Sequence, residues 1–276
     1  MLRIILLFLT ISSSLASERI ISTVPSFSEV LYELGLDREV VGVSNYCLFN
    51  KGFCAKTKVG TSLGISYEKI IKLKPTVILL SKSTDKKQLK NLKKLKIETI
   101  TLGHDRLQEV YEAISFLGKR FKKKSKARII KERMKSFIER RSMGLKKNKV
   151  LFLISSQTKN GKLVKVQAVG SKSFYTDILE ELGLENILRN SSVSFPEIGR
   201  EKLLSLNYDY VFEIFGTHNI DSIKEKSSNW SDLLNEKSKK FNYYPLSGDY
   251  LYIPGPSVWK IARDIKKGLE VTNARN

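Results

Sequence analysis

Side chains that commonly perform chemistry in proteins are scarce in this sequence. It contains two histidines, His104 and His218, which lie in different halves of the chain. Neither stands in a cluster with the spacing that a zinc or manganese site requires, so we expect both to be surface or loop residues. Walker, His-Glu-x-x-His and Gly-x-Gly-x-x-Gly motifs do not occur. We therefore expect no metal site and no catalytic residues, and an enzyme is the weaker alternative.

The N-terminal residues have the composition of an export signal. Arg3 precedes the apolar run Ile4–Leu9, and Ser14 and Ala16 supply small residues at the −3 and −1 positions of a cleavage site. The run is too short to span a bilayer as a helix. No cysteine stands at the cleavage site, so we do not expect a lipid anchor. Residues 1–16 are thus predicted to be a cleaved signal peptide on a soluble, exported protein.

The two cysteines, Cys47 and Cys54, are close together in the sequence. In an exported protein this spacing favours a disulfide that closes a small loop. A metal site is the alternative, but two cysteines without a nearby histidine are a poor set of zinc ligands. The pair is not Cys-x-x-Cys, so a thioredoxin-like redox role has little support.

The net positive charge of the chain is compatible with an anionic partner but does not by itself indicate one. The formal net charge is +21, and 41% of the residues are hydrophobic, which is enough to fill the cores of a folded protein. Lysines are spread over the whole sequence, with no arginine-rich arm and no basic motif interleaved with aromatic residues. A general lysine bias explains this at least as well as nucleic acid, which an exported protein is not expected to bind. An anionic small ligand remains open.

Short apolar runs alternate with helical patterns along most of the chain. Strands are expected at residues 19–24, 40–43, 77–80, 98–102, 150–155, 163–169 and 208–215. Helices are expected at residues 29–34, 67–74, 88–95, 107–117, 173–182, 201–206, 230–234 and 257–269. Strands that alternate with helices predict a largely parallel sheet in an α/β fold.

One longer helix interrupts this alternation between Lys124 and Gly144. The stretch has no proline, and no glycine before Gly144, while apolar residues recur at helical spacing. These residues are Ala127, Ile130, Met134, Phe137 and Ile138. A helix of about 20 residues spans about 30 Å, so we interpret it as a rigid strut between two lobes. The boundaries are then 17–121 for the N-terminal lobe, 122–146 for the connecting helix and 147–276 for the C-terminal lobe. The alternative is an ordinary surface helix within one domain.

The blocks on the two sides of this helix share a pattern. Ser26-Phe27 and Ser173-Phe174 each begin a helix that ends in Glu-Leu-Gly-Leu. Further along each block, Glu68 and Glu201 each open a second helix that precedes an apolar strand. The same order twice indicates two similar lobes.

Six motifs, taken in order, resemble one known family. They are VPSFSEVLYELGL, VVGVSNYC, KVGTSLGISYEKIIKLKPTVILL, SFYTDILEELGLENI, FPEIGREKLLSLNYDYVF and YIPGPSVWKIARDI. They cover nearly all of the chain after the signal segment, and the chain resembles the helical-backbone periplasmic binding proteins of ABC importers for cobalamin, ferric siderophores and haem. The resemblance implies two similar α/β lobes with mostly parallel sheets, joined by one long helix, with the ligand cleft between them. It also implies a periplasmic monomer without a resident cofactor, whose partners are ABC permease subunits.

The resemblance assigns roles to particular residues. Glu68 and Glu201 match the carboxylates, one on each lobe, that face arginines of the permease. The alternative is that a glutamate in the first turn of a helix only favours the helix dipole. Six residues match positions that contact ligand: Phe27, Tyr46, Ser62, Phe195, Asp249 and Tyr250. For the aromatic ones the alternative is packing in a core.

The ligand itself is less clearly indicated. Aromatic rings such as Tyr46 and Phe195 suit a corrin, a haem or a catecholate. Ser62 stands where the cobalamin branch has tryptophan, and Ser257 stands where relatives often have arginine. These departures favour a ferric siderophore, whereas the motifs VGVSNYC and FPEIGRE favour cobalamin by a small margin. A haem- or metal-binding receptor of the same fold is the further alternative.

Overall fold

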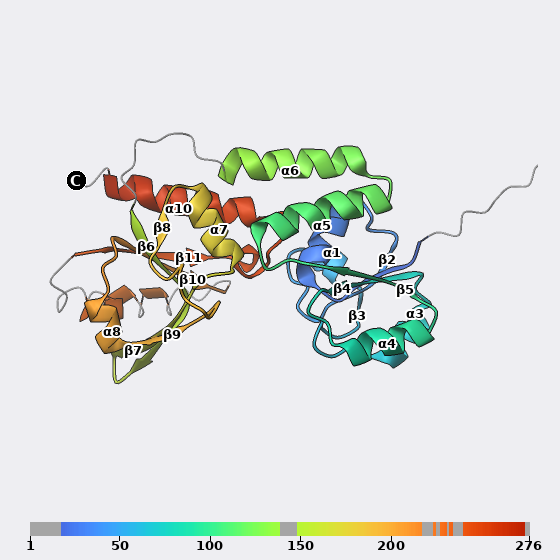
Figure 1. Ribbon diagram of the computed structural model, residues 1–276, viewed down its shortest axis with the longest axis horizontal. Helices are drawn as coiled ribbons and strands as arrows, with labels where there is room; N and C mark the ends of the chain where they lie inside the picture. Colours follow the sequence, from blue (N-terminus) through green and yellow to red (C-terminus); the bar gives the residue numbers. More distant parts are fainter. Residues whose placement is uncertain are drawn as a thin grey trace, which may run out of the picture.

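The computed structural model describes residues 18–138, 148–216, 223–224, 227–230, 232–233 and 240–273, with the side chains of 271–273 excepted. It is an elongated molecule of two α/β lobes, with one long helix that lies over the N-terminal lobe and reaches the C-terminal lobe at its far end (Figure 1). The predicted signal peptide, His218 and the last part of the predicted connecting helix lie outside the described residues.

The N-terminal lobe is built on a parallel sheet with the strand order β3-β2-β1-β4-β5. Its strands are β1 (Ile20–Ser22), β2 (Val40–Val43), β3 (Thr57–Lys58), β4 (Val77–Ser81) and β5 (Glu98–Leu102). Its helices are α1 (Pro25–Glu33), α2 (Lys51–Cys54), α3 (Tyr67–Leu73), α4 (Lys86–Lys94) and α5 (Leu107–Arg120). All residues of β4 are buried, as expected for a strand covered on both faces. The prediction of a parallel α/β sheet is confirmed for this lobe.

Side-chain alternation divides the helices of this lobe between the two faces of the sheet. Ile78 on β4 packs with Ile70 of α3 and Leu92 of α4 in one buried cluster. Leu79, the next residue, lies in the other buried cluster with Ile114 of α5. Successive side chains of a strand point to opposite faces, so α3 and α4 cover one face while α1 and α5 cover the other (Figure 1).

The C-terminal lobe has a mixed sheet with the order β11-β10-β6-β7-β9, and β8 pairs with β6. Its strands are β6 (Lys149–Lys159), β7 (Lys162–Ala168), β8 (Glu185–Asn186), β9 (Glu197–Gly199), β10 (Tyr210–Phe215) and β11 (Asn242–Ser247). Its helical segments are α7 (Phe174–Glu181), α8 (Arg200–Ser205), the 3-10 helix η1 (Asp249–Tyr252) and α10 (Val258–Asn273). Strand β10 runs parallel to both β6 and β11, and β8 runs parallel to β6. Strand β7 runs antiparallel to both β6 and β9.

The prediction of mostly parallel sheets is confirmed, and the exception is β7, which runs antiparallel to both of its neighbours. Asn160 and Gly161, which join β6 to β7, have φ angles of 52° and 72°. Positive φ at both central residues is the geometry of the tight hairpin turn that matches the twist of the strands. The sequence predicts a turn at Gly161, but the antiparallel pairing of β6 and β7 follows from this backbone geometry.

The connecting helix is α6 (Lys124–Ile138). It begins at Lys124, as the sequence predicts. Lys122, with a φ of 58°, turns the chain between α5 and α6. Ala127, Met134 and Ile138 are buried, as the helical spacing predicted. Phe137 is the exception, since it is 38% exposed and its ring lies 4.5 Å from that of Trp259 on α10. Helix α6 packs against α5 of one lobe and α10 of the other, so it is a shared layer rather than a free rod.

Candidate functional site

The sheets of the two lobes point the carboxyl ends of their parallel strands at the junction between the lobes. After β5, the carbonyl of Asp105 accepts a 2.8 Å hydrogen bond from the amide of Phe174 in the C-terminal lobe. After β11, Gly255 lies against Glu29 of α1, where a Cβ would approach the Oε2 atom to 2.4 Å. Ligands of α/β proteins commonly bind beyond the carboxyl ends of strands. The loops around this junction are therefore the candidate site.

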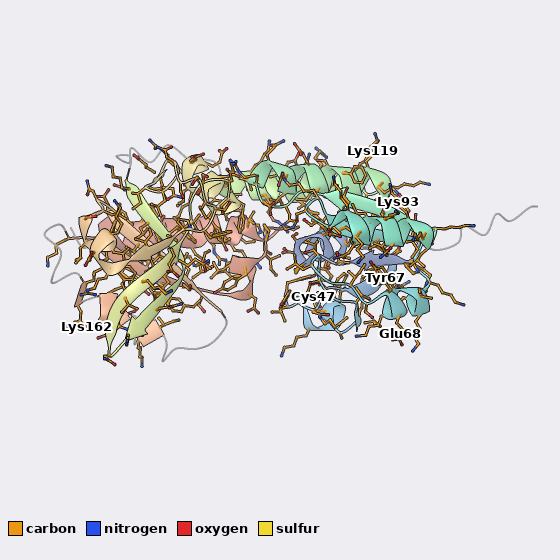
Figure 2. The ribbon with its side chains drawn as sticks, turned by 60° about the horizontal axis from the view of Figure 1, so that its bottom comes forward. Cys47, Tyr67, Glu68, Lys93, Lys119 and Lys162 are labelled. Carbon is orange, nitrogen blue, oxygen red and sulfur yellow. A yellow bond between two sulfur atoms is a disulfide. The ribbon has the colours of Figure 1, made fainter. Side chains whose placement is uncertain are left out.

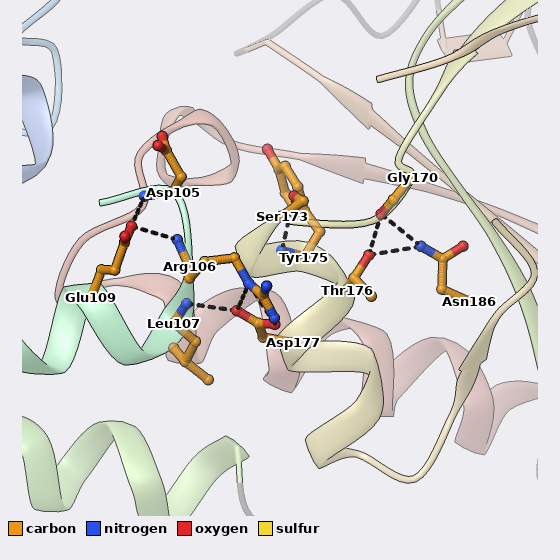
Figure 3. A network of polar contacts seen from close by, with 10 residues as sticks. All are labelled: Asp105, Arg106, Leu107, Glu109, Gly170, Ser173, Tyr175, Thr176, Asp177 and Asn186. Atoms are coloured by element: carbon orange, nitrogen blue, oxygen red, sulfur yellow. Dashed lines mark hydrogen bonds and ion pairs between the residues drawn. The ribbon is translucent and has the colours of Figure 1, made fainter. Parts of the chain in front are cut away.

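One ion pair fastens the lobes together beside α6 (Figure 3). Both oxygens of Asp177 on α7 accept hydrogen bonds from the Arg106 guanidinium, and one also accepts the Leu107 amide at 2.8 Å. The hydrogen bond to Asp177 raises the pKa of Arg106. Glu109 accepts the amides of Asp105 and Arg106 at 2.9 and 3.2 Å. The carboxylates thus hold the first turn of α5 against the other lobe.

A buried carboxyl group occupies the second contact between the lobes. Glu29 is only 3% exposed, and its Oε2 atom has no hydrogen-bond partner. Burial raises its pKa to about 7, although hydrogen bonds from Ser257 oppose the shift. The neighbouring Ser26 hydroxyl is also buried without a partner. This junction therefore contains a carboxyl group that burial favours in its protonated form.

The N-terminal wall of the site is a small loop closed by a disulfide. The predicted bond between Cys47 and Cys54 is present, with Cα atoms 5.3 Å apart. The side chain of Asn50 caps α2 by accepting the amide of Phe53 at 2.9 Å. The rings of Tyr32, Phe49 and Phe53 form a cluster with centroids 5.5 to 5.7 Å apart. Two side chains at the start of this loop, on either side of Cys47, are largely exposed: Tyr46 is 67% exposed and Leu48 is 62% exposed.

The C-terminal wall contains the segment before β9. Phe195 is 42% exposed and Val193 is 54% exposed. The segment is held by main-chain hydrogen bonds, because the amide of Gly170 donates to Ser194 at 2.8 Å. Gly170 is required here, since a Cβ would meet the carbonyl oxygen of Val193 at 2.2 Å. Hence this wall also holds apolar side chains at its surface.

The sequence analysis selected Tyr250 from the GDYLYIPGP segment, whereas the tyrosine of this segment that is exposed in the structure is Tyr252. The hydroxyl of Tyr250 bonds to the carboxylate of Asp264 on α10, and Lys260 lies 5.5 Å from the ring. Tyr252, the last residue of η1, is 46% exposed. Asp249 is partly buried at the start of η1. Tyr252 was not selected from the sequence, because only the contact with Asp264 distinguishes the two tyrosines.

Phe27 and Ser62 lie in different surroundings from the exposed candidates. Phe27 is 1% exposed, and its ring centroid lies 5.5 Å from that of His104, so in this structure it packs in the core rather than facing solvent. Ser62 is partly exposed in a turn closed by the amide of Thr61 donating to Gly64 at 2.8 Å. Residues 60–64 spell Gly-x-Ser-x-Gly, but a turn after the two-residue strand β3 is not the strand-to-helix elbow of a nucleophilic serine.

The two predicted docking carboxylates occupy matching positions. Glu68 is in the first turn of α3 and Glu201 is in the first turn of α8. The Glu68 side chain is 81% exposed and 3.4 Å from Lys72 (Figure 2). Helices α3 and α8 both lie on the side of the molecule away from α6 (Figure 1). The pair therefore marks one face that includes both lobes.

His104 is a loop residue, as expected from the sequence. It follows β5, and burial lowers its pKa. Within the described ranges, no three His, Cys, Asp or Glu side chains gather in a way that could hold a metal ion. None of the helices in the described part of the chain is both long and apolar enough to cross a membrane.

Comparisons with known proteins agree with this architecture. A family model for periplasmic binding proteins matches residues 20–229. The chain is 25% identical over 248 residues to the uncharacterized ABC transporter substrate-binding lipoprotein YvrC of Bacillus subtilis (strain 168), covering 87% of this chain and 76% of the relative. It is 22% identical over 260 residues to a vitamin B12-binding protein of Vibrio vulnificus (strain YJ016), covering 92% and 90%. The crystal structure of the periplasmic haem-binding protein HutB of Vibrio cholerae matches with a TM-score of 0.75 at 19% identity, covering 92% and 99%.

Proposed function

The chain belongs to the periplasmic binding protein family, and from this premise we propose that it binds a tetrapyrrole-like macrocycle, a corrin or a porphyrin, between its lobes. As a member of this family it is a substrate-binding protein of an ABC importer rather than an enzyme, and such proteins work with membrane permease components. Export by a cleaved signal peptide and a monomeric state are part of the same proposal.

The observation that supports this ligand class is the apolar surface on both walls. Tyr46 and Leu48 on one wall are 67% and 62% exposed, and Phe195 on the other is 42% exposed. A disulfide and main-chain hydrogen bonds hold the two walls, so these side chains are exposed by ordered loops rather than by loose ones. Aromatic side chains exposed by ordered loops, one on each lobe, suit a large, flat, apolar ligand.

Cobalamin and haem share this chemistry, and each has a named relative. One relative is a vitamin B12-binding protein and one structural neighbour is a haem-binding protein. Ser62, in place of the tryptophan expected in the cobalamin branch, removes one aromatic contact from the N-terminal wall. Lysines near the site would instead suit an anionic ferric siderophore, which is the competing ligand class.

A titration tests the proposal. The purified protein is titrated with cyanocobalamin, with haemin and with a ferric catecholate siderophore, and tyrosine and tryptophan fluorescence is followed. We expect saturable binding of cyanocobalamin or haemin. Preference for the siderophore, or binding of none of the three, would contradict the proposed ligand class.

Matched variants locate the binding surface. Tyr46→Ala and Phe195→Ala should each weaken binding by at least about tenfold, because each removes a large apolar contact. Phe116→Ala is the control, since Phe116 is 45% exposed on α5, outside both walls. Equal losses in all three variants would show that the walls do not form the site.

A further inference from the structure

Each lobe places one acidic side chain at the start of a helix of the other lobe. Glu29 on α1 and Asp177 on α7 each stand four residues before the glutamate of a Glu-Leu-Gly-Leu sequence. Both helices are followed by the same turn, since Gly35 and Gly183 each have a φ of 75°. The two acidic residues therefore occupy equivalent positions in the two lobes.

The contact made by Asp177 contains a permanent positive charge. Arg106 is the residue before α5, and its guanidinium donates hydrogen bonds to both oxygens of Asp177 (Figure 3). The amide of Leu107, the first residue of α5, donates to the same carboxylate at 2.8 Å. An arginine side chain is not deprotonated in proteins, so the cation of this contact is present at every pH at which the protein is folded.

The contact made by Glu29 has a serine at the place of that arginine. Ser257 is the residue before α10, and its hydroxyl and amide donate hydrogen bonds to the Glu29 carboxyl group. The Oε2 atom of Glu29 has no hydrogen-bond partner, and Gly255 packs so closely on it that a Cβ would lie 2.4 Å away. In the described part of the chain, Glu29 forms no ion pair. This contact therefore has the carboxyl group of its equivalent without the cation.

The charged groups around Glu29 do not replace that cation. Glu33, one turn further along α1, raises the pKa of Glu29 through its charge, and it is itself 3.1 Å from Arg133 on α6. Lys260 on α10 lowers the pKa of Glu29, but its ammonium group lies 5.5 Å from the centre of the Tyr250 ring. Burial is the largest effect and raises the pKa to about 7. The buried contact thus favours the uncharged carboxyl group.

We propose that the Glu29–Ser257 contact is a proton-dependent junction between the lobes. While the Glu29 carboxyl group is protonated, the contact stays closed, because no buried charge lacks a partner. When the carboxyl group is ionised, the contact separates and water solvates the charge. The Asp177–Arg106 contact stays closed in both cases, so the lobes remain joined there.

This junction links the spacing of the two proposed ligand walls to pH. The walls belong to different lobes, at the loop after β2 and the loop before β9, so separation of one inter-lobe contact changes the distance between them. That consequence rests on the proposed function, whereas the proton-dependent contact does not. The contact is therefore tested in the protein without ligand, and its failure is distinguishable from a failure to bind a macrocycle.

Hydrogen exchange followed by mass spectrometry compares the two contacts in one sample. Residues 25–33 and 255–262 report on the Glu29 contact, and residues 104–110 and 173–181 report on the Asp177 contact. Rates are corrected for the intrinsic pH dependence of exchange. The Glu29 carboxyl group has a pKa of about 7 in the closed contact and its usual value of 4.5 once solvated. The closed contact is thus fully stabilised below pH 4.5 and loses this stabilisation as the pH rises through about 7.

The expected result is a pH response at one contact only. Between about pH 5 and about pH 8, the open fraction of the Glu29 contact should rise about fiftyfold, and that of the Asp177 contact less than about threefold. Equal changes at the two contacts, or no change at the Glu29 contact, would overturn the proposal.

Two variants alter the carboxyl group and the cation that it lacks. Glu29→Gln keeps the shape of the side chain without a titrating group, so the pH response should disappear. Ser257→Arg supplies the cation of the equivalent contact and should reduce the response to less than about fivefold. Glu33→Gln is the control, because it removes a neighbouring carboxylate and should retain most of the response. A full response in Glu29→Gln or in folded Ser257→Arg, or its loss in Glu33→Gln, would overturn the proposal.

A further variant keeps the test decisive if Ser257→Arg does not fold, since Ser257 is only 8% exposed. Ser257→Ala removes a hydroxyl that donates to the charged form of Glu29. It should therefore move the pH at which the contact opens to a higher value. Movement to a lower pH, or no movement, would contradict control of the contact by Glu29.

Discussion

Each lobe contains a capped helix followed by a second helix and a buried strand, but the loops that we propose as ligand contacts are held by different means. In the N-terminal lobe, the Cys47–Cys54 disulfide and an aromatic cluster hold the loop after β2. In the C-terminal lobe, main-chain hydrogen bonds to Gly170 hold the loop before β9. A disulfide can be broken without altering the other lobe, whereas the second arrangement depends on the sheet itself. Similar lobes can therefore be perturbed separately.

The largest expected effect tests whether the lobes act as a pair. Glu68→Ala with Glu201→Ala should abolish ligand uptake by cells that contain the permease, because both exposed anchors are lost. Ligand affinity in solution should stay unchanged, since both carboxylates lie on helix surfaces outside the two walls. Glu132→Ala on α6 is the control, with a side chain that is 61% exposed. Normal uptake by the double variant would remove the docking assignment.

The second prediction concerns the contact where the lobes meet. The pKa of Glu29 is raised from 4.5 to about 7, so the folded protein retains a proton that the unfolded chain has lost in this range. Stability from this group is complete below pH 4.5 and falls as the pH rises through about 7, by about 3 kcal/mol. Glu29→Gln should therefore remove this pH dependence and stabilise the protein at pH 8.

Urea unfolding at several pH values measures this effect. Glu33→Gln, one turn further along α1, is the control, and its carboxylate lies 3.1 Å from Arg133. If Glu29→Gln leaves the slope of stability against pH unchanged, the buried carboxyl group does not govern this junction.

The third prediction separates the two loops. Cys47→Ser with Cys54→Ser should cost about 2.5 kcal/mol of stability, as expected for a disulfide that closes a short loop. Hydrogen exchange should increase in residues 44–58 and stay unchanged in residues 190–198, which belong to the other wall. Exchange that rises equally in both segments would show that the loops are coupled and that the two walls are not independent.

The smallest expected effect concerns the ion pair beside α6. Asp177→Ala should lower stability by about 2 kcal/mol, since it removes a charged hydrogen bond and a cap on the first turn of α5. Asp105→Ala is the control, because its carboxylate does not contact α7 in the described interactions whereas its main chain does. Chemical denaturation compares the two variants, and equal losses would contradict a specific role for Asp177.

Much of the fold could be predicted from the sequence because its signals are local. The apolar run at β4, the serine cap of α3 and the helical stripe of α6 each depend on neighbours within one element. The disulfide could be predicted because its two cysteines are close in sequence and the chain has no others. The exposed first-turn glutamates followed from the repeat of the two halves.

The remainder depends on contacts between distant residues. Tyr250 and Tyr252 look alike in the sequence, and only Asp264 on α10 decides that Tyr250 is held there. Phe27 is predicted to contact ligand, and its burial in this structure depends on His104 in the loop after β5. The direction of β7 depends on the φ angles of two turn residues. Side-chain orientation at the walls therefore could not be predicted from local patterns.

One hydrophobic core extends through both lobes. Leu31 of α1, Ile114 of α5 and Met134 of α6 belong to the same buried cluster as Ile178 of α7 and Ile261 of α10. Neither half of the chain can therefore retain its interior after separation from the other. Differential scanning calorimetry should record a single endotherm, and a chain ending before α6 should expose enough apolar surface to aggregate.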